Sequence, residues 1–271
     1  MPWSERQIGM LQEMGIRCWI PASPPHGEGD RSPQAPAERE ATASAALRGV
    51  AAAAPAAVAL GDVASLGWDG LRDAVVACTA CGLCKGRRQT VFGVGHRRAH
   101  WMIVGEAPGE QEDIQGEPFV GKSGQLLDNM LRAIGLTRAD LAGVDADAAA
   151  ARQVYIANTI KCRPPGNRNP EPDELARCEP FLIRQTQLVQ PKIILAMGRF
   201  AVQSLLRSSE PIGRLRGRVH QYQGVPLIVT YHPAYLLRNP EEKAKAWDDL
   251  CLAVAAARGT AHPSRTATAA A

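Results

Sequence analysis

The chain has 271 residues, of which 45% are hydrophobic, and a formal net charge of +4. This length supports one sizeable core with tails, and the mild basic excess is compatible with an anionic partner without singling one out. No stretch reaches the roughly 18 apolar residues that a membrane span needs. Charged residues also interrupt positions 1–20, so we expect neither a membrane span nor an export signal.

Cysteine usage points to a reducing compartment. An odd number of cysteines in two tight groups, without an export signal, argues against a disulfide framework and for metal binding or catalysis. We therefore expect a cytoplasmic protein. The seven cysteines are Cys18, Cys78, Cys81, Cys84, Cys162, Cys178 and Cys251.

The two ends of the chain differ in composition from its middle. Residues 1–65 are rich in Ala, Pro, Gly and charge, so we expect a disordered N-terminal extension and linker. A short amphipathic helix within residues 1–20 is either a frayed tail or a docking segment for a protein partner. Residues 66–258 have the pattern of a folded domain, and residues 259–271 are expected to form a disordered tail.

Within that domain the pattern alternates between apolar runs and amphipathic stretches. Ser123 is expected to cap the first helix and Gly135 to end it. Strands that alternate with helices predict an α/β sandwich around a mainly parallel sheet. The Ala- and Asp-rich residues 142–151 are expected to form a loop. The expected strands are 100–105, 154–160, 193–197 and 225–230, and the expected helices are 123–135, 173–189, 200–206 and 240–257.

Polar clusters follow three of the four expected strands. Gly105-Glu-Ala-Pro-Gly109 follows the first strand, Asn158 and Lys161-Cys-Arg-Pro-Pro165 follow the second, and His232-Pro-Ala-Tyr-Leu-Leu-Arg238 follows the fourth. Because ligands of such sheets bind outside the carboxyl ends of the strands, these clusters are the candidate site.

The cysteine spacing predicts a metal site. Cys78-Thr-Ala-Cys81 is a CxxC pair, Cys84 adds a third sulfur, and Cys162 and Cys178 lie sixteen positions apart farther along the chain. Four thiolates bind either zinc or an iron–sulfur cluster. Neither a second CxxC pair nor a His pair accompanies the first, which favours iron–sulfur. From spacing alone, Cys162 and Cys178 could also be small core residues.

A second motif is misleading. Gly116 to Ser123 matches the phosphate-loop pattern GxxxxGK[ST], but no buried strand precedes it, so a nucleotide triphosphatase is disfavoured. The start of the following helix with Lys122 can still hold a phosphate group.

Taken together, these clusters resemble the iron–sulfur branch, called family 4, of the uracil-DNA glycosylase superfamily. The likeness covers roughly residues 68–257. The matching segments are Gly105-Glu-Ala-Pro-Gly-Glu-Gln-Glu-Asp113, Pro118-Phe-Val-Gly121, Tyr155-Ile-Ala-Asn158, Lys161-Cys-Arg-Pro-Pro165 with Asn167, Arg214-Leu-Arg-Gly217, and His232 to Arg238.

The resemblance implies a fold, an activity and a cofactor. The fold is a three-layer α/β/α sandwich with a central, mainly parallel four-stranded sheet over residues 66–258. The activity is hydrolysis of the N-glycosidic bond of deoxyuridine in single- or double-stranded DNA, a base-excision step of DNA repair, and the enzyme is expected to act as a monomer. The cofactor is a [4Fe-4S] cluster held by Cys78, Cys81, Cys162 and Cys178, with Cys84 in reserve.

The resemblance also assigns roles to residues of the pocket. Phe119 stacks on the flipped uracil, Asn158 reads its edge, and His232 donates to O2 as negative charge develops on the leaving base. Gly105, Glu106 and Ala107 frame the uracil pocket, while Glu112 and Asn167 are candidates for positioning water or the base. The expected DNA contacts are Lys122, Arg163, Arg168, Arg216, Leu236, Leu237 and Arg238.

Two departures from the family pattern limit this reading. Ala107 stands where better-known relatives carry an Asp that activates water, so no general base is assigned there. Gly109 stands where relatives that exclude thymine carry a Tyr, which would leave that task to Phe119 or the neighbouring backbone. The alternative to an enzyme is a non-catalytic iron–sulfur protein or a protein that binds uracil-DNA without releasing the base.

Overall fold

The structure, a computed structural model, describes residues 60–259. The expected extension over 1–59, its docking segment and most of the expected tail lie outside the described residues. The elements, in chain order, are η1 (Leu60–Ser65), α2 (Trp68–Ala77), η2 (Gly82–Lys85), β1 (Val94–Gly95), β2 (Trp101–Gly105), α3 (Glu110–Gln115), α4 (Gly121–Ala133), α5 (Ala146–Arg152), β3 (Val154–Asn158), η3 (Pro165–Asn167), α6 (Pro172–Val189), β4 (Ile193–Met197), α7 (Arg199–Leu206), α8 (Ile212–Leu215), β5 (Val219–Tyr222), β6 (Val225–Thr230), α9 (Pro233–Arg238), η4 (Pro240–Glu242) and α10 (Lys243–Ala257).

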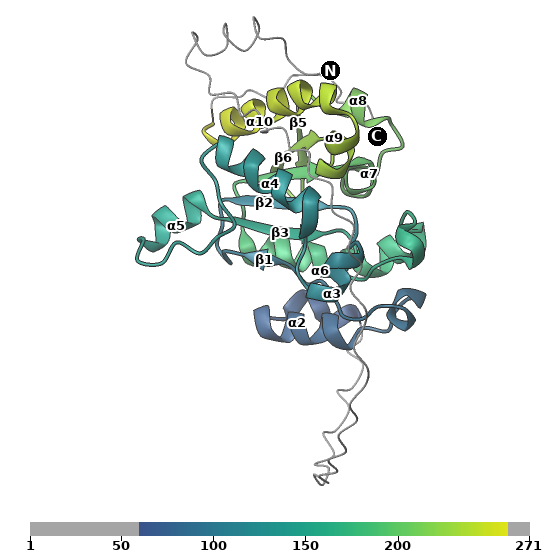
Figure 1. The fold of residues 1–271 in the computed structure, drawn as a ribbon. Helices are drawn as coiled ribbons and strands as arrows, with labels where there is room; N and C mark the ends of the chain where they lie inside the picture. The colour runs from purple at the N-terminus through teal and green to yellow at the C-terminus, as the bar shows by residue number, and fades with distance from the viewer. Residues whose placement is uncertain (1–59, 260–271) are drawn as a thin grey trace, which may run out of the picture. The chain divides into compact units, whose positions relative to one another are not determined.

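The sheet of the described region has six strands in the order β1-β3-β2-β4-β6-β5 (Figure 1). The central four are parallel, and they are the four strands expected from the sequence. β1 and β5 add antiparallel edges. In this register Gly105 pairs with Asn158, and Met197 pairs with Thr230, so the carboxyl ends of the four parallel strands meet at one edge.

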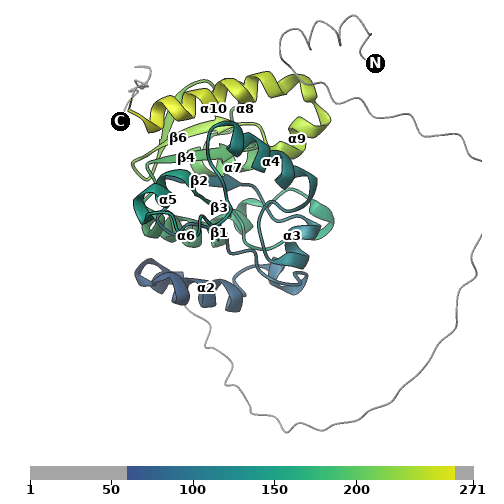
Figure 2. The same cartoon turned by 60° about the vertical axis from the view of Figure 1, so that its left-hand side comes forward.

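Helices cover both faces of the sheet, which confirms the three-layer α/β/α sandwich (Figures 1 and 2). Side chains alternate along each strand. Ile103 and Leu195 face one layer, where they pack with residues of α4, α9 and α10. Met102 and Ile194 face the other layer, formed by α6, α7 and α8. Outside this second layer, α2 and η1 pack against α6.

Some elements differ from the expectation. Residues 146–152 form helix α5 rather than a loop, because the Asp145 side chain caps the Asp147 and Ala148 N–H groups. Helix α4 begins at Gly121 with Val120 as its N-cap, so Ser123 lies inside the helix and does not cap it. Leu60–Ser65, assigned to the linker, form a 3-10 helix instead. In residues 60–259, no helix is long and apolar enough to span a membrane.

Candidate active site

A cavity of about 730 Å³ opens at the carboxyl ends of the parallel strands. Its walls come from all three predicted polar clusters and from the start of α7, which follows β4. The lining includes Glu106, Ala107, Pro108, Gly109, Glu112, Phe119, Ser123, Asn158, Asn167, Arg168, Asn169, Gly198, Arg199, Phe200, Tyr231, His232, Tyr235 and Arg238. The position agrees with the expectation drawn from the strand ends.

Two glycines allow the walls to approach each other. A Cβ at Gly105 would lie 2.5 Å from Asn158 Oδ1 and 2.6 Å from Phe119 Cε2. A Cβ at Gly198, whose φ is +96°, would lie 2.4 Å from Glu106 Oε1. Side chains from distant segments therefore converge above the ends of β2 and β4, where only glycine leaves room.

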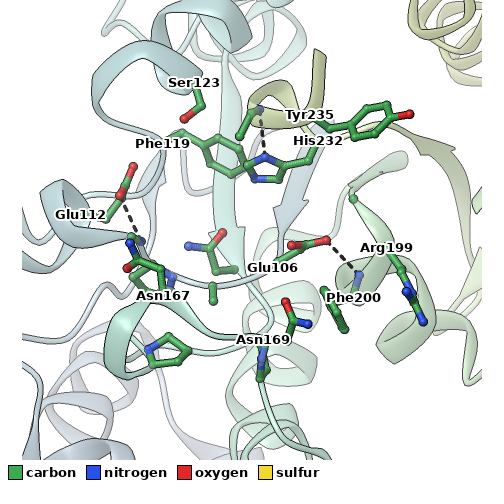
Figure 3. Close-up of a pocket in the computed structure, with 18 of the residues that line it drawn as sticks. Glu106, Glu112, Phe119, Ser123, Asn167, Asn169, Arg199, Phe200, His232 and Tyr235 are labelled. Atoms are coloured by element: carbon green, nitrogen blue, oxygen red, sulfur yellow. Dashed lines mark hydrogen bonds between the residues drawn. The ribbon is translucent and has the colours of Figure 1, made fainter. Parts of the chain in front are cut away.

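His232 is held as a neutral hydrogen-bond donor. It caps α9, and its Nδ1 accepts a hydrogen bond of 3.1 Å from the Ala234 N–H, which places the ring proton on Nε2. Burial, with a smaller contribution from Arg238, lowers the pKa of His232 to about 4. The imidazole stacks on Phe119 with ring centroids 5.2 Å apart (Figure 3). A neutral Nε2–H suits donation to an oxygen on which negative charge develops.

Phe119 is buried and has φ of 55°, a left-handed conformation that is strained for a bulky residue. Glu112 fixes the surrounding loop. One carboxylate oxygen accepts from the Val120 N–H at 3.0 Å, and the other accepts from the Gly109 N–H at 3.1 Å. The Glu112 carboxylate therefore ties the segment after β2 to the segment that presents the Phe119 ring.

Asn167 has a left-handed φ of 55° and lies across the cavity from the Phe119–His232 pair (Figure 3). Its Oδ1 accepts a hydrogen bond of 2.7 Å from Arg163 Nε. The neighbouring Arg168 forms a bidentate pair with Glu174, at 2.5 and 2.9 Å. Both arginines thus hold the loop after β3 in place. These bonds use some, but not all, of the N–H groups of each guanidinium.

The sequence analysis missed the residues after β4. Glu106 Oε1 accepts a hydrogen bond of 2.9 Å from the Phe200 N–H, near the start of α7. Burial raises the pKa of Glu106, which the Phe200 N–H and Arg199 oppose. Gly198 and Arg199 follow the third buried strand directly. The rule that singled out the other strand ends could have found them.

The predicted DNA contacts separate into exposed and enclosed residues. Lys122, on the first turn of α4, and Arg238, on the cavity rim, are exposed. Leu237 has 43% of its surface exposed, and Tyr235 has 36%. Leu236 is only 1% exposed and packs in the core, so its assignment to a DNA contact is corrected.

Arg216 also needs correction, because its side chain turns toward the core. Its guanidinium lies 2.9 Å from the fully buried Asp249 on α10 and stacks over the Tyr231 ring at 5.3 Å. Tyr231 in turn stacks on Tyr235, with ring centroids 5.0 Å apart. Arg216 thus supports the residue that precedes His232 and offers little surface to DNA.

All five cysteines of the predicted metal region line one small cavity, of about 10 Å³. Cys78, Cys81 and Cys84 come from the segment after α2, Cys162 from the loop after β3, and Cys178 from α6. Arg87 Nη1 donates to Cys162 Sγ at 3.2 Å, and the Lys161 N–H donates to Cys178 Sγ at 3.3 Å. We refer to this cavity as the cysteine pocket.

The donor set of the cysteine pocket consists of thiol sulfurs, which suit zinc or an iron–sulfur cluster. Burial raises the pKa of the Cys178 thiol to about 12, opposed by Lys161, so a thiolate there requires further positive charge. Within residues 60–259, no group of three or more His, Cys, Asp or Glu could hold a metal ion.

Comparison with known proteins identifies the family. Residues 92–251 match the model of the uracil-DNA glycosylase superfamily. The chain belongs to this superfamily. Its curated relatives place it in the type-4 branch, as the motifs predicted. It is 40% identical over 175 residues to a type-4 uracil-DNA glycosylase of Archaeoglobus fulgidus, covering 62% of this chain and 81% of the relative.

Two further type-4 relatives agree. The chain is 41% identical over 181 residues to the type-4 uracil-DNA glycosylase of Saccharolobus solfataricus, covering 64% of this chain and 78% of the relative. It is 41% identical over 167 residues to that of Thermotoga maritima, covering 61% and 80%. The superfamily match includes every residue that lines the large cavity, whereas Cys78, Cys81 and Cys84 precede it.

Proposed function

We propose that the chain hydrolyses the N-glycosidic bond of deoxyuridine in DNA, which releases uracil and leaves an abasic site. The observation that carries the proposal is the convergence of Phe119, Asn158 and a neutral His232 on one cavity, in a chain of this family. An aromatic face, a base-reading amide and a donor for the leaving base are the groups that excision of a flipped base needs.

Each of these residues has a distinct role in the proposal. Phe119 stacks on the flipped uracil. The Asn158 amide accepts from uracil N3–H and donates to O4, an edge pattern that cytosine reverses. His232 donates its Nε2–H to O2 while negative charge accumulates on the leaving base, as an oxyanion hole does. Gly105, Glu106 and Ala107 form the floor of the uracil pocket.

Glu112 and Asn167 are the proposed residues that position water at the sugar. Both line the cavity, on the same side of it (Figure 3). Each already bonds a protein partner, so each is fixed in orientation before substrate enters. Stabilisation of the leaving base by His232 reduces the demand on a strong base.

Contacts to DNA come from the exposed residues around the cavity. Lys122 and Arg238 are proposed to contact phosphates, and Leu237 with Tyr235 to enter the base stack opened by flipping. Arg163 and Arg168 are proposed to contact DNA with the donors that their protein partners leave free. We further propose that the chain acts as a monomer on single- or double-stranded DNA.

A [4Fe-4S] cluster is the proposed occupant of the cysteine pocket, with Cys78, Cys81, Cys162 and Cys178 as ligands and Cys84 as a possible replacement. When bound, it would cross-link the segment after α2 to the loop after β3 and to α6. The pocket supports this proposal by its five sulfurs and its N–H donors to Cys162 and Cys178. A reducing cytoplasm would keep these thiols available.

The test is uracil release from an oligonucleotide with a single uracil, followed by alkaline strand scission. Scission by the full-length chain is expected, together with a loss of at least about 100-fold in Asn158→Ala or His232→Ala. Gln187→Ala, on the α6 surface away from the cavity, is the matched control. No scission by a folded wild-type chain would overturn the proposal. A retained DNA adduct would instead favour a protein that binds uracil-DNA without releasing the base.

A further inference from the structure

Lys161 is a buried cation without a protein anion. The residue is 1% exposed, and its ammonium donates to the Asn158 carbonyl at 2.8 Å and to Gln185 Oε1 at 2.7 Å. Both partners are neutral. Among the ion pairs of residues 60–259, none includes Lys161. Lysine is rarely buried without a counter-charge, because removing an ammonium from water is costly.

A counter-charge for Lys161 has a place at the cysteine pocket, which this residue lines. Lys161 precedes Cys162 in sequence and donates its main-chain N–H to Cys178 Sγ at 3.3 Å. A negative charge held at the sulfurs of Cys162 and Cys178 would therefore lie close to Lys161. An iron–sulfur cluster with four thiolate ligands carries a net negative charge, which neutral thiols lack.

A buried network fixes Lys161 on its other side. Gln185, which is fully buried on α6, donates from Nε2 to the Phe92 carbonyl at 2.8 Å and to the Tyr155 hydroxyl at 3.1 Å. These bonds orient the Gln185 oxygen toward the ammonium. The lysine is therefore held between the cysteine pocket and the last residue of β3, Asn158, whose side chain lines the uracil cavity.

We propose that Lys161 is a positioning residue that joins the two sites: its ammonium neutralises a cluster in the cysteine pocket and holds the main chain of Asn158 in place. This inference rests on the cluster and the base-reading role proposed above. Loss of the cluster leaves a buried, uncompensated cation. The ammonium then draws in water or moves, and the Asn158 carbonyl loses its partner.

The first experiment compares Lys161→Met with the wild type in the full-length chain. Methionine keeps an unbranched side chain of similar length without the charge. Lys192→Met, at an exposed position before β4, removes the same charge elsewhere and is the matched control. The measurements are iron and sulfide content, the rate of iron release to a chelator, and kcat and KM for uracil release.

Lys161→Met is expected to release iron about 10-fold faster than the wild type, as outer-shell partners of metal sites typically do when removed. Its kcat is expected to fall at least about 10-fold with a smaller change in KM, because a shifted Asn158 weakens the reacting geometry. Lys192→Met should match the wild type in both. Wild-type iron release and kcat in Lys161→Met would overturn the inference.

A second experiment measures thermal unfolding with and without iron, and the change in thermal midpoint caused by Lys161→Met should have opposite signs in the two states. Lys161→Met should lower the thermal midpoint of the iron-loaded chain and raise that of the same chain stripped of iron, because the buried charge is then uncompensated. If Lys161→Met does not fold, Gln185→Glu takes its place. In Gln185→Glu a carboxylate lies beside the ammonium and balances its charge. Iron removal should therefore lower the thermal midpoint of Gln185→Glu by less than it lowers that of the wild type. An equal loss in both chains would overturn the inference.

The outcomes separate this inference from the proposals beneath it. A folded wild-type chain without iron and sulfide would overturn the cluster and the inference together. A wild-type chain that holds iron but releases no uracil would overturn only the enzymatic proposal, and the iron-release and thermal measurements would still decide the charge role of Lys161.

Discussion

Replacing His232 by Gln removes a half-buried imidazole whose pKa is lowered from 6.5 to about 4 by loss of solvent and, to a smaller degree, by Arg238. Between these two values the unfolded chain binds a proton that the folded chain does not. The contribution of His232 to stability is therefore complete above pH 6.5 and is lost as the pH falls toward 4. Protonation would also turn Nδ1 into a donor facing the Ala234 N–H, which breaks the existing bond.

The size of this effect follows from the two pKa values. One pKa unit corresponds to about 1.4 kcal/mol, so the full difference corresponds to about 3 kcal/mol, of which about 2 kcal/mol falls between pH 7 and pH 5. For a domain of this size, that loss lowers the thermal midpoint by roughly 4–8 °C. Other groups titrate in the same range. The relevant quantity is therefore the difference between the wild type and His232→Gln.

Thermal unfolding of both chains at pH 7 and pH 5 measures that difference. The wild type should lose roughly 4–8 °C more than His232→Gln on acidification. Proton NMR of the histidine rings gives an independent reading, in which the signals missing from His232→Gln should not titrate above about pH 5. Equal acid sensitivity of the two chains, or a His232 signal that titrates near 6.5, would refute the neutral imidazole.

Three further substitutions test the site and its support. Gly105→Ala should lower the rate of uracil release roughly 100-fold, since its Cβ would meet Asn158 and Phe119. The control is Gly213→Ala, whose Cβ would have nothing within 4 Å and which should match the wild type in the same assay. Glu112→Gln keeps one acceptor oxygen and should lower kcat/KM about 10-fold without changing the pH profile; loss of the acidic limb would indicate a general base. Arg216→Met leaves the buried Asp249 without its ion-pair partner and should lower the thermal midpoint by at least about 5 °C. Adding Asp249→Leu to this variant should partly restore the thermal midpoint.

The central sheet could be predicted because each of its parallel strands is marked by a short apolar run in the sequence. The four parallel strands are buried on both faces and appear in the sequence as continuous apolar runs, such as Ile193–Met197. The edge strands carry no such signal, since β1 has two residues and β5, Val219–Tyr222, has only one buried residue among its four. Helix α5 was missed because an Ala- and Asp-rich segment suggests a loop until Asp145 is recognised as a cap.

The site residues could be predicted where a motif directly follows a strand. The exposure of a side chain could not be predicted where it depends on partners far away in the sequence. Arg216 pairs with a residue 33 positions away, which the sequence around it does not indicate. Leu236 and Leu237 are adjacent and chemically alike, and only the packing of α9 against α4 decides which one is exposed. The lysine of the Lys161-Cys162 pair was treated only as part of a motif, because its burial depends on Gln185 of α6.

The loop after β3 connects the uracil cavity to the cysteine pocket. Asn158 ends the strand and lines the cavity, Cys162 lines the cysteine pocket, and Asn167 returns to the cavity with a left-handed backbone. Few local contacts fix this return, chiefly the Arg163–Asn167 bond and the pairing of Arg168 with the start of α6. Asparagine adopts this left-handed backbone readily, so the position of the loop depends on contacts that anchor its two ends. Linking Cys162 and Cys178 to the segment after α2 would supply that anchor, so loss of the cysteine link should displace Asn167 before it unfolds the sheet.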